Sequence, residues 1–207
     1  MLASGQASMR VLGIDTASPR PELALVEAPD APGARGAVAA LPPAAAEALP
    51  AALSSLLSSS GVPASSLACV AVLSGPGSFT GLRAGIAFAR GLARALGIPL
   101  VTVPTFDAAR AALDPAQGPA DLFLGAGRGE VFRCRARPGA DAPAFDRLPR
   151  HDAEAEAAEA GVPGIDLAEV RLALASAAAR LAAGGASGDD GGPAYGRRSA
   201  AEERFGS

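Results

Sequence analysis

Two short stretches hold residue types that could bind a phosphate group. Asp15-Thr16 ends one apolar stretch, and Gly75-Pro76-Gly77-Ser78 ends another. An acidic residue at a strand end can orient a metal-bound water, and turn amides can hold phosphate oxygens. The alternative is structural, because Asp and Thr are common turn formers and Ser78 or Thr80 can cap a following helix. Pro76 removes one donor and no lysine follows, so the residues favour the structural role.

A third stretch occupies the position of a second phosphate loop. The run from Gly125 to Gly129 is rich in glycine and is expected to be a hairpin turn. An ATPase would need an acidic residue in this turn, and the nearest carboxylate is that of Glu130. A carboxylate on a strand is more often solvated than catalytic, so Glu130 is a weak candidate.

The composition excludes several kinds of chemistry. All eighteen basic residues are arginine, so neither a Walker-type phosphate loop nor a Schiff base can form, since both need lysine. His151 is the single histidine, and Cys69 and Cys134 lack metal-ligand spacing. These three residues are expected to have structural or surface roles. The net charge of −3 gives no sign of tight nucleic-acid binding by this chain alone.

The beginning of the chain carries no targeting signal. Residues 1–8 lack the charged start and apolar centre of a signal peptide, and they are expected to form a disordered tail. No uninterrupted apolar stretch of about 18 residues is present, so a membrane span is not expected. Together these features predict a cytoplasmic protein.

The hydrophobic pattern predicts an α/β chain built from two units that each begin with a hairpin. The first unit covers residues 9–113, a shortened second unit covers 114–183, and a linker and tail cover 184–207. The expected strands are 10–16, 23–26, 37–41, 67–73, 99–103, 122–124 and 130–135. The expected helices are 44–59, 80–96 with Gly97 as its C-cap, one that Thr105 caps and that runs to about Leu113, a short one at 152–160, and one from Asp166 to Ala183 with a capping-box-like start. The segment 138–165 is expected to be weakly structured.

Helix 80–96 has almost no polar face. At 100° per residue, its three arginines form one narrow stripe, and apolar or small residues fill the rest. Such a helix is covered on most sides. We expect it to lie beside helix 44–59 and to form half of an intersubunit four-helix bundle; burial by the C-terminal helix is the alternative. The expected interface residues are Leu49, Leu53, Leu56, Leu82, Gly85, Ile86, Phe88, Ala89 and Leu92.

Three motifs in this chain resemble the TsaB (YeaZ) family. They are Leu12-Gly13-Ile14-Asp15-Thr16-Ala17-Ser18, the specific run from Ser74 to Arg83, and Arg128-Gly129-Glu130-Val131-Phe132. The resemblance covers residues 9–135 well and the rest poorly. It implies an actin-like/sugar-kinase-like (ASKHA) fold with ribonuclease H-like subdomains, the second of them reduced.

The resemblance also implies a function. A TsaB-like protein is a non-catalytic partner of TsaD in the threonylcarbamoyl modification of tRNA adenosine next to the anticodon. It implies a heterodimer with TsaD, a ternary complex with the ATPase TsaE, homodimers through the same helices, and tRNA reached only through the complex. No cofactor is expected in this chain, because ATP would be bound mainly by the partners. The phosphate loops would then be vestigial: Asp15, Thr16, Gly75, Gly77, Ser78, Gly129 and Glu130.

The chain departs from the family pattern at two places. Ala46-Glu47 stands where the family has a His–Glu pair, and Gly125-Ala126-Gly127 stands where it has Asp-Ala-Arg. Two other interpretations stay open. One is a small actin-like ATPase or phosphotransferase that uses Asp15 and the 75–78 turn, and the other is a stand-alone structural dimer.

Overall fold

The computed structural model describes residues 9–27, 29, 35–42, 45–113, 118–136, 145–170 and 173–184. The expected tail 1–8, residues 114–117 and residues 185–207 lie outside this part of the chain. The strands are β1 (Arg10–Asp15), β2 (Glu22–Glu27), β3 (Arg35–Ala40), β4 (Cys69–Gly75), β5 (Leu100–Pro104), β6 (Ala120–Gly127), β7 (Glu130–Ala136), β8 (Phe145–Pro149) and β9 (Gly164–Asp166). The helices are α1 (Ala45–Ser59), the short 3-10 helix η1 (Ala64–Ser66), α2 (Phe79–Leu96), α3 (Thr105–Ala112), α4 (Arg150–Glu159) and α5 (Leu174–Ala183).

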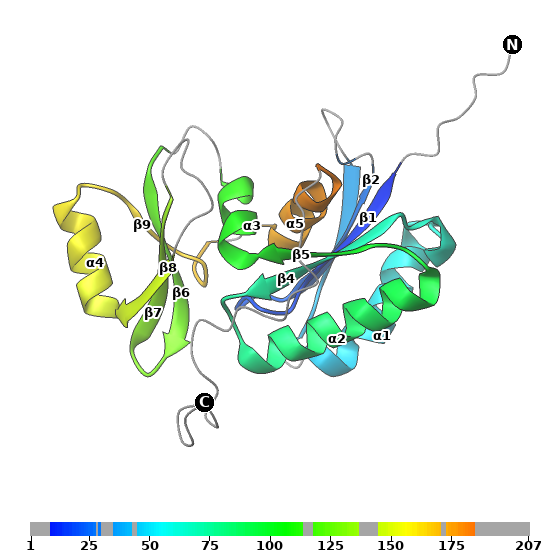
Figure 1. Cartoon of the computed structure of the whole chain (residues 1–207), viewed down its shortest axis with the longest axis horizontal. Coiled ribbons are helices and arrows are strands. Elements are labelled where there is room, and N and C mark those ends of the chain that lie inside the picture. Colours follow the sequence, from blue (N-terminus) through cyan, green and yellow to red (C-terminus); the bar gives the residue numbers. More distant parts are fainter. Residues whose placement is uncertain are drawn as a thin grey trace, which may run out of the picture.

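The first sheet has the strand order β3-β2-β1-β4-β5. Strands β1, β2 and β3 form an antiparallel meander, whereas β4 and β5 run parallel to β1. Helices α1 and α2 cover one face of this sheet, and α3 and α5 lie on the other (Figure 1). This is the hairpin-first α/β unit that the hydrophobic pattern predicts.

Successive side chains of the central strands point to opposite faces of the sheet, so the core lies partly on each face. Val11 packs on the side of α3 and α5, and the next residue, Leu12, packs on the side of α1 and α2. Strand β4 alternates in the same way and is buried along its whole length. A strand buried on both faces reads as a continuous apolar run, which is why Val70–Leu73 was recognisable in the sequence.

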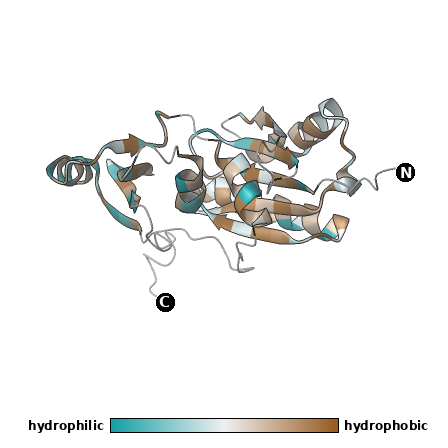
Figure 2. Cartoon of the chain, turned by 90° about the horizontal axis from the view of Figure 1, so that it is seen from above, coloured by the Kyte–Doolittle hydropathy of each residue, from teal (hydrophilic) through white to brown (hydrophobic). Residues whose placement is uncertain are grey.

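The second sheet repeats the beginning of the first. Its order is β8-β7-β6-β9, again an antiparallel meander of three strands with a parallel fourth beside the first of them. Helix α4 covers this sheet with Ala153 and Ala157, and its exposed side carries charged residues together with Ala155 and Ala158 (Figure 2). The expectation of weak structure over 138–165 is therefore wrong from residue 145 onward, while residues 137–144 are not described.

The C-terminal helix returns to the first sheet, contrary to the expected 114–183 unit. Helix α5 packs on β1, β2 and β4. Its first turn approaches β1 so closely that a Cβ on Gly13 would lie 1.9 Å from the carbonyl oxygen of Ala175. The Glu22 carboxylate accepts a hydrogen bond from the Ala175 amide at 3.2 Å, so β2 supplies the polar contact at the start of this helix.

Two expected helix starts were wrong. Asp166 ends β9, and its carboxylate accepts from the Ala168 amide at 2.8 Å in a turn rather than in a capping box. The helix expected from that residue begins only at Leu174. Thr105 is the first residue of α3 rather than its cap, because Pro104 occupies the cap position.

A continuous core joins the two sheets. Phe106 of α3 contacts Phe145 of β8 with ring centroids 5.9 Å apart, and Phe145 meets Phe132 of β7 edge-on at 5.8 Å. The same cluster extends from Val11 in β1 to Leu122 in β6. Apolar side chains therefore occupy the space between the two sheets on the α3 side.

The buried side chain of Arg133 in β7 forms hydrogen bonds with both β8 and α4. The Arg133 guanidinium, 2% exposed, donates to both carboxylate oxygens of Asp146 at 3.1 and 2.6 Å and to Glu156 at 2.7 Å. These hydrogen bonds, with that to Asp146 first, raise the pKa of Arg133 although burial opposes the shift. Glu156 also accepts from Arg135 at 2.7 Å, but the Arg135 side chain is 55% exposed.

This pair of arginines gives a matched test of burial. We expect Arg133→Ala to lower the free energy of unfolding by about 3 kcal/mol, because it breaks a buried network. Arg135→Ala removes a bond of the same length to the same carboxylate, and we expect a loss below about 1 kcal/mol because water already solvates that side chain. Urea denaturation of the two variants measures the difference. Equal losses would show that burial of Arg133 does not decide the strength of this network.

Candidate functional site

The two expected phosphate loops meet at the carboxyl ends of β1 and β4. Asp15 is fully buried, and its Oδ1 accepts hydrogen bonds from the amides of Ala17 and Ser18 at 2.9 Å each. The Ser18 hydroxyl donates to the other oxygen at 2.5 Å. The turn amides that could face a phosphate are therefore bonded to the carboxylate of the same turn.

Burial changes the acid–base behaviour of Asp15. Loss of hydration raises its pKa from the ordinary value of 3.8 to about 6, although the hydrogen bonds from Ser18 and Ala17 oppose the shift. A raised pKa in a cleft is a common sign of an acid or base in catalysis. Here the carboxylate is enclosed, and both of its oxygens already accept hydrogen bonds, so its geometry is that of a structural turn.

The turn after β4 begins helix α2 as the sequence predicted. Gly75 has a φ of 109°, a backbone conformation that favours glycine. Ser78 is the N-cap, and its hydroxyl accepts from the Gly81 amide at 3.2 Å. The Ser78 amide donates to the Ala17 carbonyl at 2.8 Å, which ties this turn directly to the turn after β1.

Glycines bring the two turns into direct contact. The Thr16 hydroxyl donates to the Gly81 carbonyl at 2.7 Å. A Cβ on Gly77 would lie 2.4 Å from the Ala17 carbonyl oxygen, and one on Gly81 would lie 1.8 Å from that of Thr16. A Cβ on Gly85 would lie 2.1 Å from the Thr16 hydroxyl. The two turns therefore fill the space that a phosphate group would need between them.

The third expected loop is separate from these two. Gly127, Arg128 and Gly129 all have positive φ at the tip of the β6–β7 hairpin, in the second sheet. Glu130 forms an ion pair with Arg147 of β8. The sequence left Glu130 as a solvated position, whereas the structure pairs it with a neighbouring strand. Asp15 and Glu130 lie in different sheets and form no joint acidic site.

Most of the expected interface residues are covered by the chain itself. Leu82 and Ala89 are fully buried, and Ile86 is 3% exposed. Gly85 lies against Thr16. Leu49, Leu53 and Leu56 of α1 are also buried, on the same face of the first sheet. Only Phe88 and Leu92 are half-exposed.

The apolar face of α2 packs on the first sheet, so its buried residues cannot touch a partner in this conformation. The predicted contact with a second protein stays a prediction for Phe88 and Leu92. The surface that remains on α2 combines the small residues Ala84, Ala87, Gly91 and Ala95 with the exposed side chains of Arg83, Arg90 and Arg94. On α1 it is made of alanines, serines, Glu47 and Pro50. Sequence periodicity marks an apolar face of a helix but does not say what covers it.

The charged residues around α4 do not form a second candidate functional site. Arg150, Asp166 and Glu154 line a cavity of about 340 Å³ beside α4, and Arg150 pairs with Asp166 at 2.7 Å. His151 is exposed next to Asp152. Within the described ranges, no cluster of three or more His, Cys, Asp or Glu side chains could hold a metal ion. The described helices include none long and apolar enough to cross a membrane.

Two solved structures are similar to this chain. A structure of "YeaZ from Pseudomonas aeruginosa" is similar over 88% of this chain and 96% of that one, with a TM-score of 0.65 and 23% identity. A second structure, an uncharacterised protein with similarity to the peptidase YeaZ from Pseudomonas aeruginosa, covers 68% of this chain and 67% of that one, with a TM-score of 0.57 and 26% identity. No curated protein sequence matches.

The two hairpin-first sheets and these neighbours define a protein of the actin-like, or ASKHA, fold. The model of the family "TsaD: tRNA N6-adenosine threonylcarbamoyltransferase" matches residues 43–152, about half of the chain. The chain belongs to this family, and the two solved structures that it resembles are a YeaZ protein and a protein similar to YeaZ. It therefore has a role in the threonylcarbamoyl modification of tRNA.

Proposed function

We propose that this chain is a non-catalytic partner of TsaD and that it acts as a scaffold or activator. The single observation that carries this proposal is the packing between the turns after β1 and β4. The amides of the turn after β1 donate to Asp15, and the Ser78 amide of the turn after β4 donates to the Ala17 carbonyl of the first turn. Gly77 and Gly81 leave no space between them for a phosphate group. A protein of this fold without such a space is better suited to binding another subunit than to phosphate chemistry.

The alternative, an ATPase or phosphotransferase that uses Asp15, needs the same two turns to separate. Calorimetry with ATP and magnesium distinguishes the two proposals. We expect no micromolar binding to the isolated chain. Micromolar binding that disappears in Asp15→Ala would favour the enzyme instead.

The proposed docking surface is the outward side of α1 and α2. Ala84, Ala87 and Gly91 leave the α2 backbone accessible to a close helical neighbour. The adjoining surface of α1 carries small side chains, among them Ala51 and Ser54. Two helices with small outward side chains can approach two helices of a partner closely. A bundle of this kind with TsaD, extended by TsaE, would use an interface of ordinary size, about 1,600 Å² in total.

The docking proposal is tested by a charge at the centre of this surface. A charge at Ala89 would test folding instead, because Ala89 is fully buried. Ala87 is exposed, and we expect Ala87→Glu to reduce co-purification with TsaD at least about tenfold, because the larger side chain prevents a close approach of the partner helices even where Arg83 or Arg90, one helical turn away, pairs with it. The matched control is Ala155→Glu on the exposed side of α4, which should bind TsaD normally. Wild-type binding by a folded Ala87→Glu variant would contradict the bundle.

A second copy of this chain could occupy the same surface in place of TsaD. Sedimentation of the chain with and without TsaD measures which complex forms, and the Ala87→Glu variant should be monomeric in both cases. We propose that tRNA and any ATP are bound in the assembled complex.

A further inference from the structure

Three arginines form a row along α2. Arg83, Arg90 and Arg94 fall within about 40° of one another around the helix axis and extend over about 16 Å along it. All three are exposed. The helix contains no acidic residue, so its own side chains do not neutralise this row.

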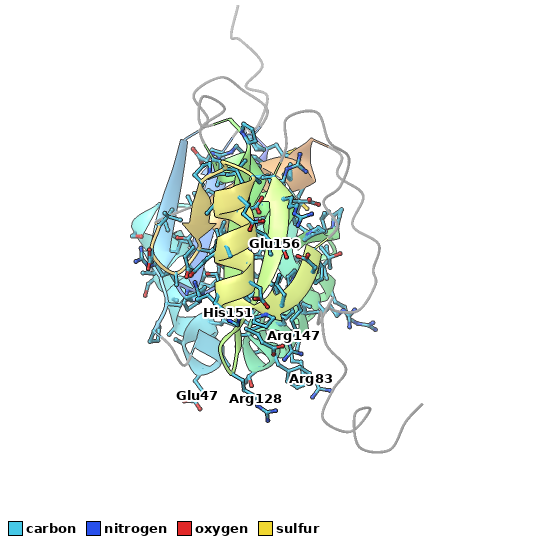
Figure 3. The ribbon with its side chains drawn as sticks, turned by 90° about the vertical axis from the view of Figure 1, so that its left-hand side faces the viewer. Glu47, Arg83, Arg128, Arg147, His151 and Glu156 are labelled. Carbon is cyan, nitrogen blue, oxygen red and sulfur yellow. The ribbon has the colours of Figure 1, made fainter. Side chains whose placement is uncertain are left out.

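A fourth arginine extends the row onto the second sheet. Arg128 is exposed at the tip of the β6–β7 hairpin, where its φ is 55°. The hairpin tip and the beginning of α2 both lie at the lower edge of the molecule in Figure 1. Arg83 and Arg128 reach the lower edge in the view at right angles, and Glu47 of α1 is seen at the same level (Figure 3). Arg83, Arg94 and Arg128 form no ion pair with any residue that the structure describes.

The row lies on the flank of α2 that faces away from α1. Phe88 and Leu92 pack against the cluster that contains the α1 leucines. At 100° per residue, the small outward side chains lie between the arginines on one flank of the helix and Phe88 and Leu92 on the other. A partner seated on the outward side of α1 and α2 would therefore leave the arginine row at the rim of the assembly. The hairpin tip with Arg128 belongs to the second sheet, outside the two helices.

We propose that the arginine row Arg83, Arg90, Arg94 and Arg128 binds the phosphate backbone of tRNA. This inference rests on the proposed function, since it assigns one contact of the assembled complex to this chain. Guanidinium groups bind phosphate oxygens through paired hydrogen bonds. A row of this length, spread over two elements, suits a chain of phosphates better than one small anion. Contacts of this kind position RNA without reading its sequence.

The test measures binding of a fluorescent transfer RNA transcript to the full-length chain over a series of low salt concentrations. Each phosphate contact adds about 0.7–0.9 to the slope of log affinity against log salt. We expect Arg83→Gln/Arg128→Gln to reduce this slope by about 1.4–1.8 and to weaken binding at least tenfold at the lowest salt. The control Arg10→Gln/Arg180→Gln makes the same change in net charge at distant positions. Circular dichroism checks that both variants are folded.

The outcomes separate this inference from the proposed function. A reduced salt slope in the first double variant alone supports the arginine row. Equal effects in the two double variants would mean that net charge alone attracts RNA, and would overturn the inference. Co-purification of Arg83→Gln/Arg128→Gln with TsaD should be normal. Its loss would place these arginines inside the docking surface and also overturn the inference, while the partnership with TsaD would stand.

Discussion

Replacing Gly81 by alanine should destabilise the fold by at least about 3 kcal/mol, whereas the same change at Gly91 in the same helix should stabilise it by about 0.5–1 kcal/mol. The Cβ added at Gly81 would lie 1.8 Å from the Thr16 carbonyl oxygen, and the one added at Gly91 would meet nothing within 4 Å. Alanine is the better helix former at both positions. The difference between the two variants therefore measures the contact between the turn after β1 and α2.

Chemical denaturation of both variants gives this difference directly. A third variant identifies the atom responsible, because Gly85→Ala would meet the Thr16 hydroxyl at 2.1 Å rather than backbone. Thr16→Ala removes this hydroxyl, so Gly85→Ala should cost less in a Thr16→Ala background. Gly81→Ala should not be rescued, because the Thr16 carbonyl remains. If Gly81→Ala is as stable as Gly91→Ala, the two turns are not packed as described.

The sequence predicted the local structure of this region well. Ser78 as N-cap and Gly97 as left-handed C-cap bound α2 almost where expected, because both ends depend on residues close in the chain. The hairpin of β1 and β2 and the buried strand β4 are confirmed for the same reason. The sequence predicts a turn at Gly77 and a contact with a partner at Gly85. Their actual partners, Thr16 and Ala17, lie about 60 residues earlier in the sequence.

The remaining differences come from contacts between distant segments. Nothing near Gly13 in the sequence shows that α5, more than 150 residues later, packs on it. A lone glycine inside a strand does indicate a close approach by other backbone, and this was the available signal. Two polar contacts are likewise invisible in the sequence. Glu22 of β2 accepts a hydrogen bond from the first turn of α5, and Arg133 of β7 binds carboxylates of β8 and α4. The same limit applies to α2, whose apolar face packs on the first sheet.

Replacing Asp15 by asparagine should stabilise the protein relative to wild type at neutral pH and have less benefit in acid. The folded pKa of Asp15 is about 6 against an ordinary value of 3.8. The protonated carboxyl therefore contributes stability that is fully present below about pH 3.8 and is lost as the pH rises through about 6. The difference between these two pKa values corresponds to about 3 kcal/mol, a large share of the roughly 5–15 kcal/mol typical of a folded domain.

Asparagine is a suitable replacement because it keeps the contacts of the turn. Its amide oxygen can accept from Ala17 and Ser18 as Oδ1 does, and its amide group can donate to the Ser18 hydroxyl, which also accepts from the Arg20 amide at 3.2 Å. We expect the difference in unfolding free energy between Asp15→Asn and wild type to increase by about 3 kcal/mol between pH 3.8 and pH 7. Urea denaturation at several pH values measures it, and other titrating groups cancel in the difference. A difference that does not change with pH would mean that the Asp15 carboxylate stays ionised in the fold and is hydrated, which would reopen the turn after β1 to a phosphate-binding role.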